Sequence, residues 1–213
     1  MTRDGKAWIG AAAAGHTDLF GPVVVIAVAV TDATASALLD AGVTNTDADT
    51  TQMADLAAAV ASSCPHAAVS VSPSRYNELL ADLGSRDPVL AWAHARAIED
   101  LLGEIPCGSA IVERFCDERT LQRALMTRAS RASVLQGEAA STDAAVAAAA
   151  LIASAMFDEE LTALSSSYDM ALPKGTGTGA AVVREELLRR HGAGVLAEVA
   201  KLDLELELED TGR

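Results

Sequence analysis

The sequence predicts a single α/β domain built on a central sheet. Short runs rich in valine and alanine, typical of strands, alternate along the 213 residues with longer segments of helical spacing. Half of the residues are hydrophobic but only 3% are aromatic, so the core must consist mainly of aliphatic side chains. No linker-like stretch is long enough to divide the chain.

The first two strands are expected to form a hairpin at the centre of the sheet. Residues 8–14 and 22–31 are apolar, and the second run is rich in valine, as buried central strands are. The loop between them contains Gly15 and Gly21. Residues 33–41 and 49–63 are then expected to form two helices.

The middle of the chain continues the alternation. A strand at 67–72 is followed by Pro73, which is favoured in the first turn of a helix. Residues 76–83 and 89–102 have helical spacing, and in the second segment apolar residues form one stripe. The next expected elements are a strand at 109–115, a helix at 118–127 and a strand at 133–136.

The C-terminal third is predicted to be mostly helical. We expect Thr142 to cap a long alanine-rich helix that ends near residue 165, with Asp143 in its first turn. A glycine-rich loop at 174–179 should precede helices at 182–191 and 195–202. From 202 to 209 leucine alternates with acids, so residues 203–213 are predicted to be an edge strand, an acidic tail or a strand that docks on a partner.

The acidic balance limits the choice of partners. Thirty acidic residues against sixteen basic residues give a formal net charge of −14, and only three of the bases are lysines. Such a charge repels nucleic acid at ordinary ionic strength. Few lysines and many acids are also typical of proteins adapted to high salt, where the screening length falls to about 3 Å. The acidity therefore argues against a nucleic-acid partner only in a low-salt cell.

Composition also bears on localisation. No apolar run reaches the length of a membrane span or forms a secretory leader, so we expect a cytoplasmic protein with no membrane partner. Three cysteines, without the spacing of a metal site, are expected to be reduced.

Several motifs together resemble ribonuclease HIII, a branch of the type 2 ribonuclease H family. From residue 10 the chain reads Gly-Ala-Ala-Ala-Ala-Gly-His-Thr-Asp-Leu-Phe-Gly-Pro, where the family has Gly-(Ser/Thr)-Asp-Glu-(Val/Ala)-Gly-(Lys/Arg)-Gly-Asp-(Tyr/Phe)-Phe-Gly-Pro. Further similar segments follow in the family's order, at 72–79, 90–98, 145–153, 172–175 and 200–202. The resemblance covers about residues 8–202. It implies one ribonuclease H-like domain at 1–202, with a mixed central sheet flanked by helices, and without the separate N-terminal substrate-binding domain typical of ribonuclease HIII.

The resemblance also implies a chemistry for which most of the expected groups are missing. Members of the family cut the RNA strand of RNA–DNA hybrids with two divalent ions, Mg²⁺ or Mn²⁺, held by four carboxylates. Those four positions fall at Ala12, Ala13, Glu113 and Ala140. Methyl groups cannot ligate a hard cation. Glu113 is thus the one remnant, and it stands where the family has Asp.

Groups that contact nucleic acid have also changed. The backbone-binding turn of the family falls at Gly15, His16 and Thr17, which lack its basic residue. The basic residue of a second motif is replaced at 45–47, and Ser154 stands where the family has arginine. The groups for metal and phosphate have gone, whereas the groups for packing remain.

Two hypotheses follow. The first is a catalytically inactive homologue, needing no metal, that binds an RNA–DNA hybrid, another nucleic acid or a protein. The second is a metal-dependent endoribonuclease that uses Mg²⁺ or Mn²⁺ with relocated ligands, namely Glu113, Asp18 and Asp143. We favour the first, because displaced ligands rarely recover the geometry that metal catalysis needs. Asp143 would then be a capping residue and Asp18 a loop acid.

Two other features have competing interpretations. His94, in an apolar helix, is expected to be a core or boundary histidine rather than a ligand. Five arginines form a basic cluster that could contact a nucleic-acid backbone, although solvated helix faces have the same pattern. They are Arg114, Arg119, Arg123, Arg128 and Arg131.

Overall fold

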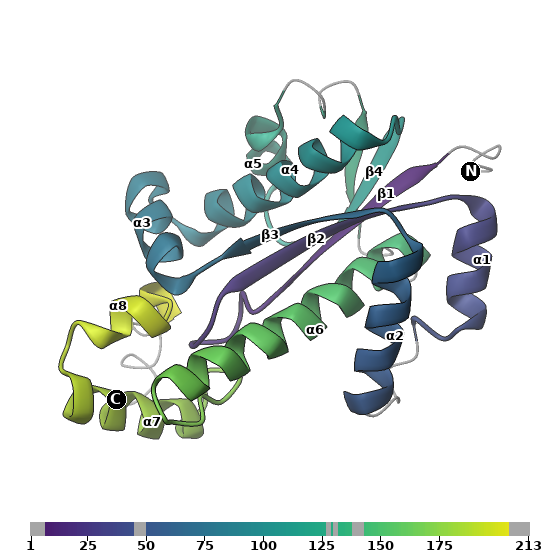
Figure 1. Cartoon of the computed structure of the whole chain (residues 1–213). Coiled ribbons are helices and arrows are strands. Elements are labelled where there is room, and N and C mark those ends of the chain that lie inside the picture. Colours follow the sequence, from purple (N-terminus) through teal and green to yellow (C-terminus); the bar gives the residue numbers. More distant parts are fainter. Residues whose placement is uncertain (1–6, 45–49, 127–128, 130–131, 138–142, 205–213) are drawn as a thin grey trace.

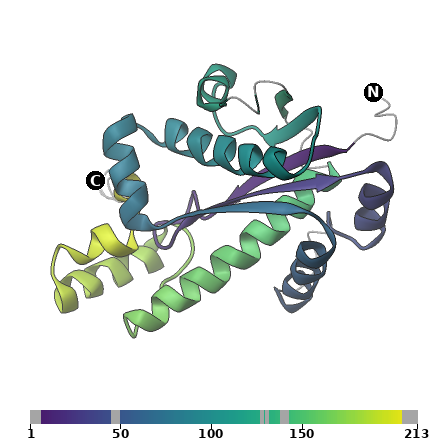
Figure 2. The ribbon, with the colours of Figure 1, turned by 45° about the horizontal axis from the view of Figure 1, so that its top comes forward.

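A five-stranded mixed sheet with helices on both faces forms the described part of the protein (Figures 1 and 2). The computed structural model describes residues 7–44, 50–126, 129, 132–137 and 143–204. The strands are β1 (Trp8–Ala14), β2 (Val23–Val30), β3 (His66–Val71), β4 (Ser109–Glu113) and β5 (Ser133–Gly137). The helices are α1 (Asp32–Asp40), α2 (Thr50–Ser63), α3 (Pro73–Leu83), α4 (Arg86–Glu104), α5 (Glu118–Ala124), α6 (Ala144–Ser167), α7 (Thr178–His191) and α8 (Val195–Val199).

The strand order is β3-β2-β1-β4-β5. β1 and β2 form the expected antiparallel hairpin, in register from Trp8 opposite Val30 to Ala14 opposite Val24. β1 also pairs in parallel with β4, and β4 in parallel with β5. Every residue of β2 is buried, in agreement with its valine-rich sequence. The predicted α/β class with a mixed sheet is confirmed.

Each face of the sheet has its own hydrophobic core. α6 lies along β1 and β2 on one face, where α1 and α2 also pack, and α4 and α5 lie on the other (Figure 1). Gly10 allows α6 to approach, because a Cβ there would lie 2.2 Å from the backbone carbon of Ala145. Neighbouring residues of β1 face opposite cores, so the strand joins the two halves of the domain.

Several expected boundaries were wrong. β4 ends at Glu113 rather than 115, and α7 begins at Thr178, so part of the expected glycine-rich loop is helical. α8 ends at Val199 rather than 202, and residues 203 and 204 are helical rather than part of an edge strand or a tail, because Leu204 is buried in the α6-side core. Burial against the rest of the domain overrides the alternating pattern. The remainder of that segment, 205–213, lies outside the described residues.

The start of α6 also differs from the expectation. Asp143 is the N-cap itself rather than a residue of the first turn. Its Oδ1 accepts hydrogen bonds from the backbone N of Ala145 and of Val146, at 3.0 and 3.4 Å. Thr142, the expected cap, lies outside the described residues. Among the helices described, none is both long and apolar enough to cross a membrane.

Candidate functional site

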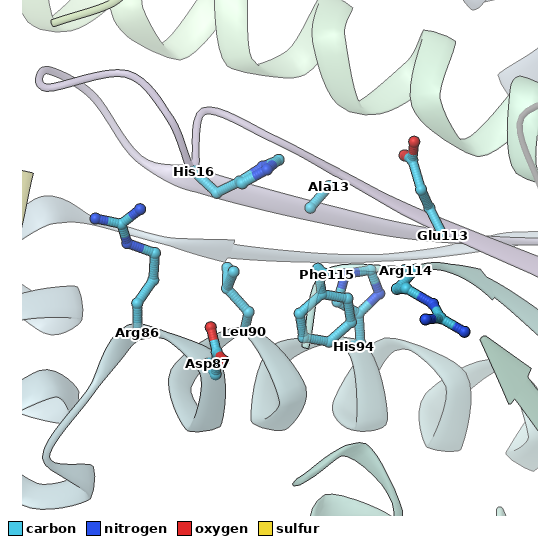
Figure 3. Close-up of a pocket in the computed structure, with 9 residues that line it drawn as sticks. All are labelled: Ala13, His16, Arg86, Asp87, Leu90, His94, Glu113, Arg114 and Phe115. Carbon is cyan, nitrogen blue, oxygen red and sulfur yellow. The ribbon is translucent and has the colours of Figure 1, made fainter. Parts of the chain in front are cut away.

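A depression of about 290 Å³ lies between α4 and the carboxyl ends of β1 and β4 (Figure 3). Carboxyl ends of parallel strands are the usual place for ligands in α/β folds. The lining residues come from four segments: β1, the turn after it, the first half of α4, and the end of β4 with the two residues that follow it. They are Ala13, His16, Arg86, Asp87, Leu90, His94, Glu113, Arg114 and Phe115.

Two of the four positions at which the resemblance expects acids, Ala13 and Glu113, line this depression. Ala11 pairs with Val112, so Ala12, Ala13 and Glu113 follow at neighbouring strand ends. Ala13 is half-buried and Glu113 is exposed, and both line the depression. Ala12 faces the opposite core beneath α6 and is 0% exposed. The fourth position, Ala140, lies outside the described residues.

The turn after β1 places His16 at the depression. Gly15 has φ +80°, and a Cβ there would lie 2.2 Å from the carbonyl oxygen of Pro22, so only glycine fits. His16 lines the depression, whereas Thr17 is exposed and does not. Of the three residues expected to contact nucleic acid, the structure therefore places one side chain in the depression.

Two C-terminal segments hold this turn in place. The Oδ1 of Asp18 accepts a hydrogen bond of 2.6 Å from the backbone N of Gly175. Lys201 donates from Nζ to the carbonyl oxygens of Gly21 and Phe20, at 2.6 and 3.4 Å. Lys201 is 0% exposed, and this burial lowers its pKa to about 7. These contacts explain why a lysine belongs in the motif at 200–202, for which the sequence alone suggested no role.

Arg86 is anchored at one end of the depression. Its Nε donates to Oδ2 of Asp203 at 2.9 Å, and Tyr76 Oη donates to the same oxygen at 3.0 Å. Burial and the Asp203 charge together raise the pKa of Tyr76. The sequence reasoning missed Arg86, because its partner lies 117 positions away.

Two histidines line the depression. His94 is 2% exposed and stacks on Phe115, with ring centroids 4.6 Å apart, so the expected core histidine is confirmed. Burial, with a smaller contribution from His16, lowers its pKa to about 3. Burial also lowers the pKa of His16, although Asp18 and Glu113 oppose the shift. The Nδ1 atoms of both rings are buried and have no hydrogen-bond partner within the described part of the chain.

The relocated ligand set is not brought together. Within the described residues, no three His, Cys, Asp or Glu side chains form a group that could hold a metal ion. Asp18 binds the backbone of Gly175, and Asp143 caps α6 and accepts a hydrogen bond from Trp8 Nε1. Glu113 is thus separate from the two acids proposed to assist it.

The comparisons with known proteins decide the family. The ribonuclease HII family model matches residues 9–205. The chain belongs to this family. Ribonuclease HIII from Protochlamydia amoebophila (strain UWE25) is 32% identical over 195 residues, which are 91% of this chain and 64% of that protein. Ribonuclease HIII from Chlamydia pneumoniae is 30% identical over 209 residues, 94% of this chain and 69% of that protein. This family member thus spans roughly two thirds of the length of these relatives.

Solved structures agree with the family and the fold. Bst-RNase HIII in complex with Mn²⁺ is 26% identical with a TM-score of 0.84, covering 93% of this chain and 67% of that chain. A second solved structure is the PCNA:RNase HII complex from Archaeoglobus fulgidus, with 21% identity and a TM-score of 0.73. The match covers 92% of this chain and 93% of that chain, and at this identity it supports the fold alone. The expected resemblance to ribonuclease HIII is confirmed.

Proposed function

We propose that this ribonuclease HIII-like protein binds nucleic acid through the depression and does not cut it. The observation that carries the proposal is the pair of methyl groups at Ala12 and Ala13. Two-metal cleavage requires acidic side chains that converge on two cations about 4 Å apart. Glu113 is a single exposed carboxylate, and it cannot bind two hard ions that each need several oxygen ligands.

The neighbouring acids support the same conclusion. Asp143 serves as a helix cap and Asp18 as an anchor for the 174–175 segment. In each carboxylate Oδ1 already accepts the backbone hydrogen bonds, so turning the group toward a metal would put those bonds at risk. Losing such a bond costs about 1–3 kcal/mol if the backbone donor stays buried and unpaired.

The lining of the depression is less acidic than the chain as a whole. Its arginines, Arg86 and Arg114, equal its acids, Asp87 and Glu113, in number, although Arg86 also pairs with Asp203, in a chain of formal net charge −14. A carboxylate at position 13 would make the depression more negative and would demand cations before a phosphate could approach. Ala13 removes that demand. Binding of a protein partner is the competing outcome.

A hybrid-binding assay run beside a cleavage assay tests the proposal. We expect an RNA–DNA hybrid to bind in the presence of a chelator, and no cleavage with Mg²⁺ or Mn²⁺ at low or molar salt. Salt screens the repulsion between the acidic surface and the nucleic acid. This repulsion should therefore weaken the binding less at high salt than at low salt. Failure to bind any nucleic acid at either salt would contradict the proposal.

The second candidate is a metal-dependent ribonuclease that uses Glu113. The family membership and the Mn²⁺ complex of the structural neighbour favour it. It predicts cleavage that disappears in Glu113→Ala and also in Glu113→Gln, which keeps the size of the side chain but removes its charge. Under our proposal neither substitution changes the absence of cleavage.

A further inference from the structure

We infer that the depression binds a single nucleotide without a metal ion. This inference rests on the proposed function, because it names the part of a nucleic acid that the site accepts. Its volume of about 290 Å³ lies just below the usual range of ligand pockets, about 300 to 1,000 Å³. A site of this size suits one nucleotide, whereas a duplex can only lie across its opening.

One part of the depression suits a flat heteroaromatic ring. Phe115 provides the accessible aromatic surface, and the buried Leu90 and His94, each 2% exposed, pack behind it. The buried Nδ1 of His94 and that of His16 have no partner among the described residues, and an unmet buried hydrogen bond costs about 1–3 kcal/mol. Because both nitrogens are buried, a base or sugar edge recovers part of that cost only when the side chains that cover them move aside.

The protonation of the two histidines fits such a ligand. Because burial lowers the pKa of both rings, both are neutral at pH 7. A neutral imidazole has one donor and one acceptor nitrogen, as the edge of a nucleobase requires. Two imidazolium rings would instead select anions alone.

The ends of the depression suit a phosphate. Arg86 and Arg114 lie at opposite ends, with the two histidines and Phe115 between them (Figure 3). The Arg86–Asp203 ion pair fixes one guanidinium, and the guanidinium geometry matches phosphate oxygens. Ala13 has no charge and little volume, so it leaves room where a glutamate would repel a phosphate.

The experiment titrates the full chain with nucleoside 5′-monophosphates in a chelator, by calorimetry or ligand-observed NMR. Nucleosides, ribose 5-phosphate and inorganic phosphate form separate arms. We expect a mononucleotide to bind about tenfold more tightly than any of these fragments, because it fills both parts of the depression. Absence of mononucleotide binding up to about 10 mM, or binding equal to that of phosphate alone, overturns the inference.

Matched variants locate the site. Ala13→Glu should weaken mononucleotide binding at least about tenfold through charge repulsion. Ala81→Glu adds the same charge at an exposed position of α3 and should leave affinity unchanged. Arg114 is exposed, so Arg114→Gln preserves the fold and should weaken binding even if Ala13→Glu does not fold. Unchanged affinity in Arg114→Gln, or in a folded Ala13→Glu, overturns the inference.

The results of the mononucleotide titration and of the hybrid-binding assay distinguish this inference from the proposed function. Hybrid binding without mononucleotide binding overturns only the present inference. Mononucleotide binding without hybrid binding supports it and contradicts the proposed function.

Discussion

Trp8 donates a hydrogen bond of 3.1 Å from its indole Nε1 to Oδ1 of Asp143, 135 positions away. The same oxygen caps α6, so a single carboxylate ties this helix to the start of β1. The carboxylate therefore has a structural role, as a helix cap and as a link between α6 and β1.

Removing this carboxylate should destabilise the fold. Asp143→Ala removes the cap and the Trp8 bond, and we expect a loss of about 2 kcal/mol in the free energy of unfolding. Asp143→Asn keeps an oxygen that accepts from the α6 backbone, so its loss should be smaller. Chemical denaturation measures both values. Equal losses in the two variants would show that charge, rather than the cap, is what matters.

Gly10 sets the distance between β1 and α6. A Cβ at this position would lie 2.3 Å from the backbone N of Val146 as well as 2.2 Å from the carbon of Ala145. Backbone atoms cannot move aside as a flexible side chain can, so Gly10→Ala should cost about 3 kcal/mol or more, or prevent folding.

The matched control for this change is Gly108→Ala. A Cβ there meets nothing within 4 Å, so thermal melting should change little. A Gly10→Ala protein as stable as the parent chain would mean that α6 can shift away from the sheet at little cost.

The sequence predicted the elements whose signal is local. The segments that form β1 and β2 are rich in alanine and valine, which indicates buried strands, and Pro73 marks the start of α3. The resemblance to ribonuclease HIII supplied Ala12, Ala13 and Glu113, because those positions are fixed by motifs within a few residues of each.

The missed features depend on contacts between distant segments. Arg86 meets Asp203, and Lys201 meets the carbonyl of Gly21, 180 positions away. No periodicity or motif spacing records such pairs. The prediction of an edge strand or tail from residue 203 fails at residues 203 and 204 for the same reason, since the burial of Leu204 decides their helical form.

The stability of the domain should fall in acid in part because of His94. Its pKa is about 3 in the folded chain and 6.5 when exposed. Between these values the unfolded chain holds one proton more than the folded chain, so stability decreases by about 1.4 kcal/mol per pH unit as pH falls through this window. Above pH 6.5 the ring is neutral in both states and the dependence disappears.

The variant His94→Phe tests this assignment. It keeps an aromatic ring against Phe115 but cannot titrate, so its curve of unfolding free energy against pH should be flatter between pH 6.5 and 3. The carboxylates contribute equally to both proteins, so the difference between the two curves isolates the histidine. Parallel curves would show that His94 is exposed to protonation in the folded chain.

Placing acids at the positions where the resemblance expects them tests the proposed loss of the metal site. Ala12 is 0% exposed beneath α6, so a carboxylate in Ala12→Asp must be buried, and we expect a loss of about 3 kcal/mol. Ala13 is half-buried at the depression, so Ala13→Glu should cost less. In the absence of metal, repulsion among the new acids and Glu113 should lower the melting temperature of the double variant further.

Added Mn²⁺ then separates the two hypotheses. A ligand that binds only the folded state stabilises by about 2.7 kcal/mol at a concentration one hundred times its dissociation constant. If the alanines abolished the metal site, Mn²⁺ should raise the melting temperature of the double variant and leave that of the unsubstituted chain unchanged. An equal rise in the melting temperature of the unsubstituted chain would mean that it already binds the ion. The hypothesis that it has lost its metal site would then be wrong.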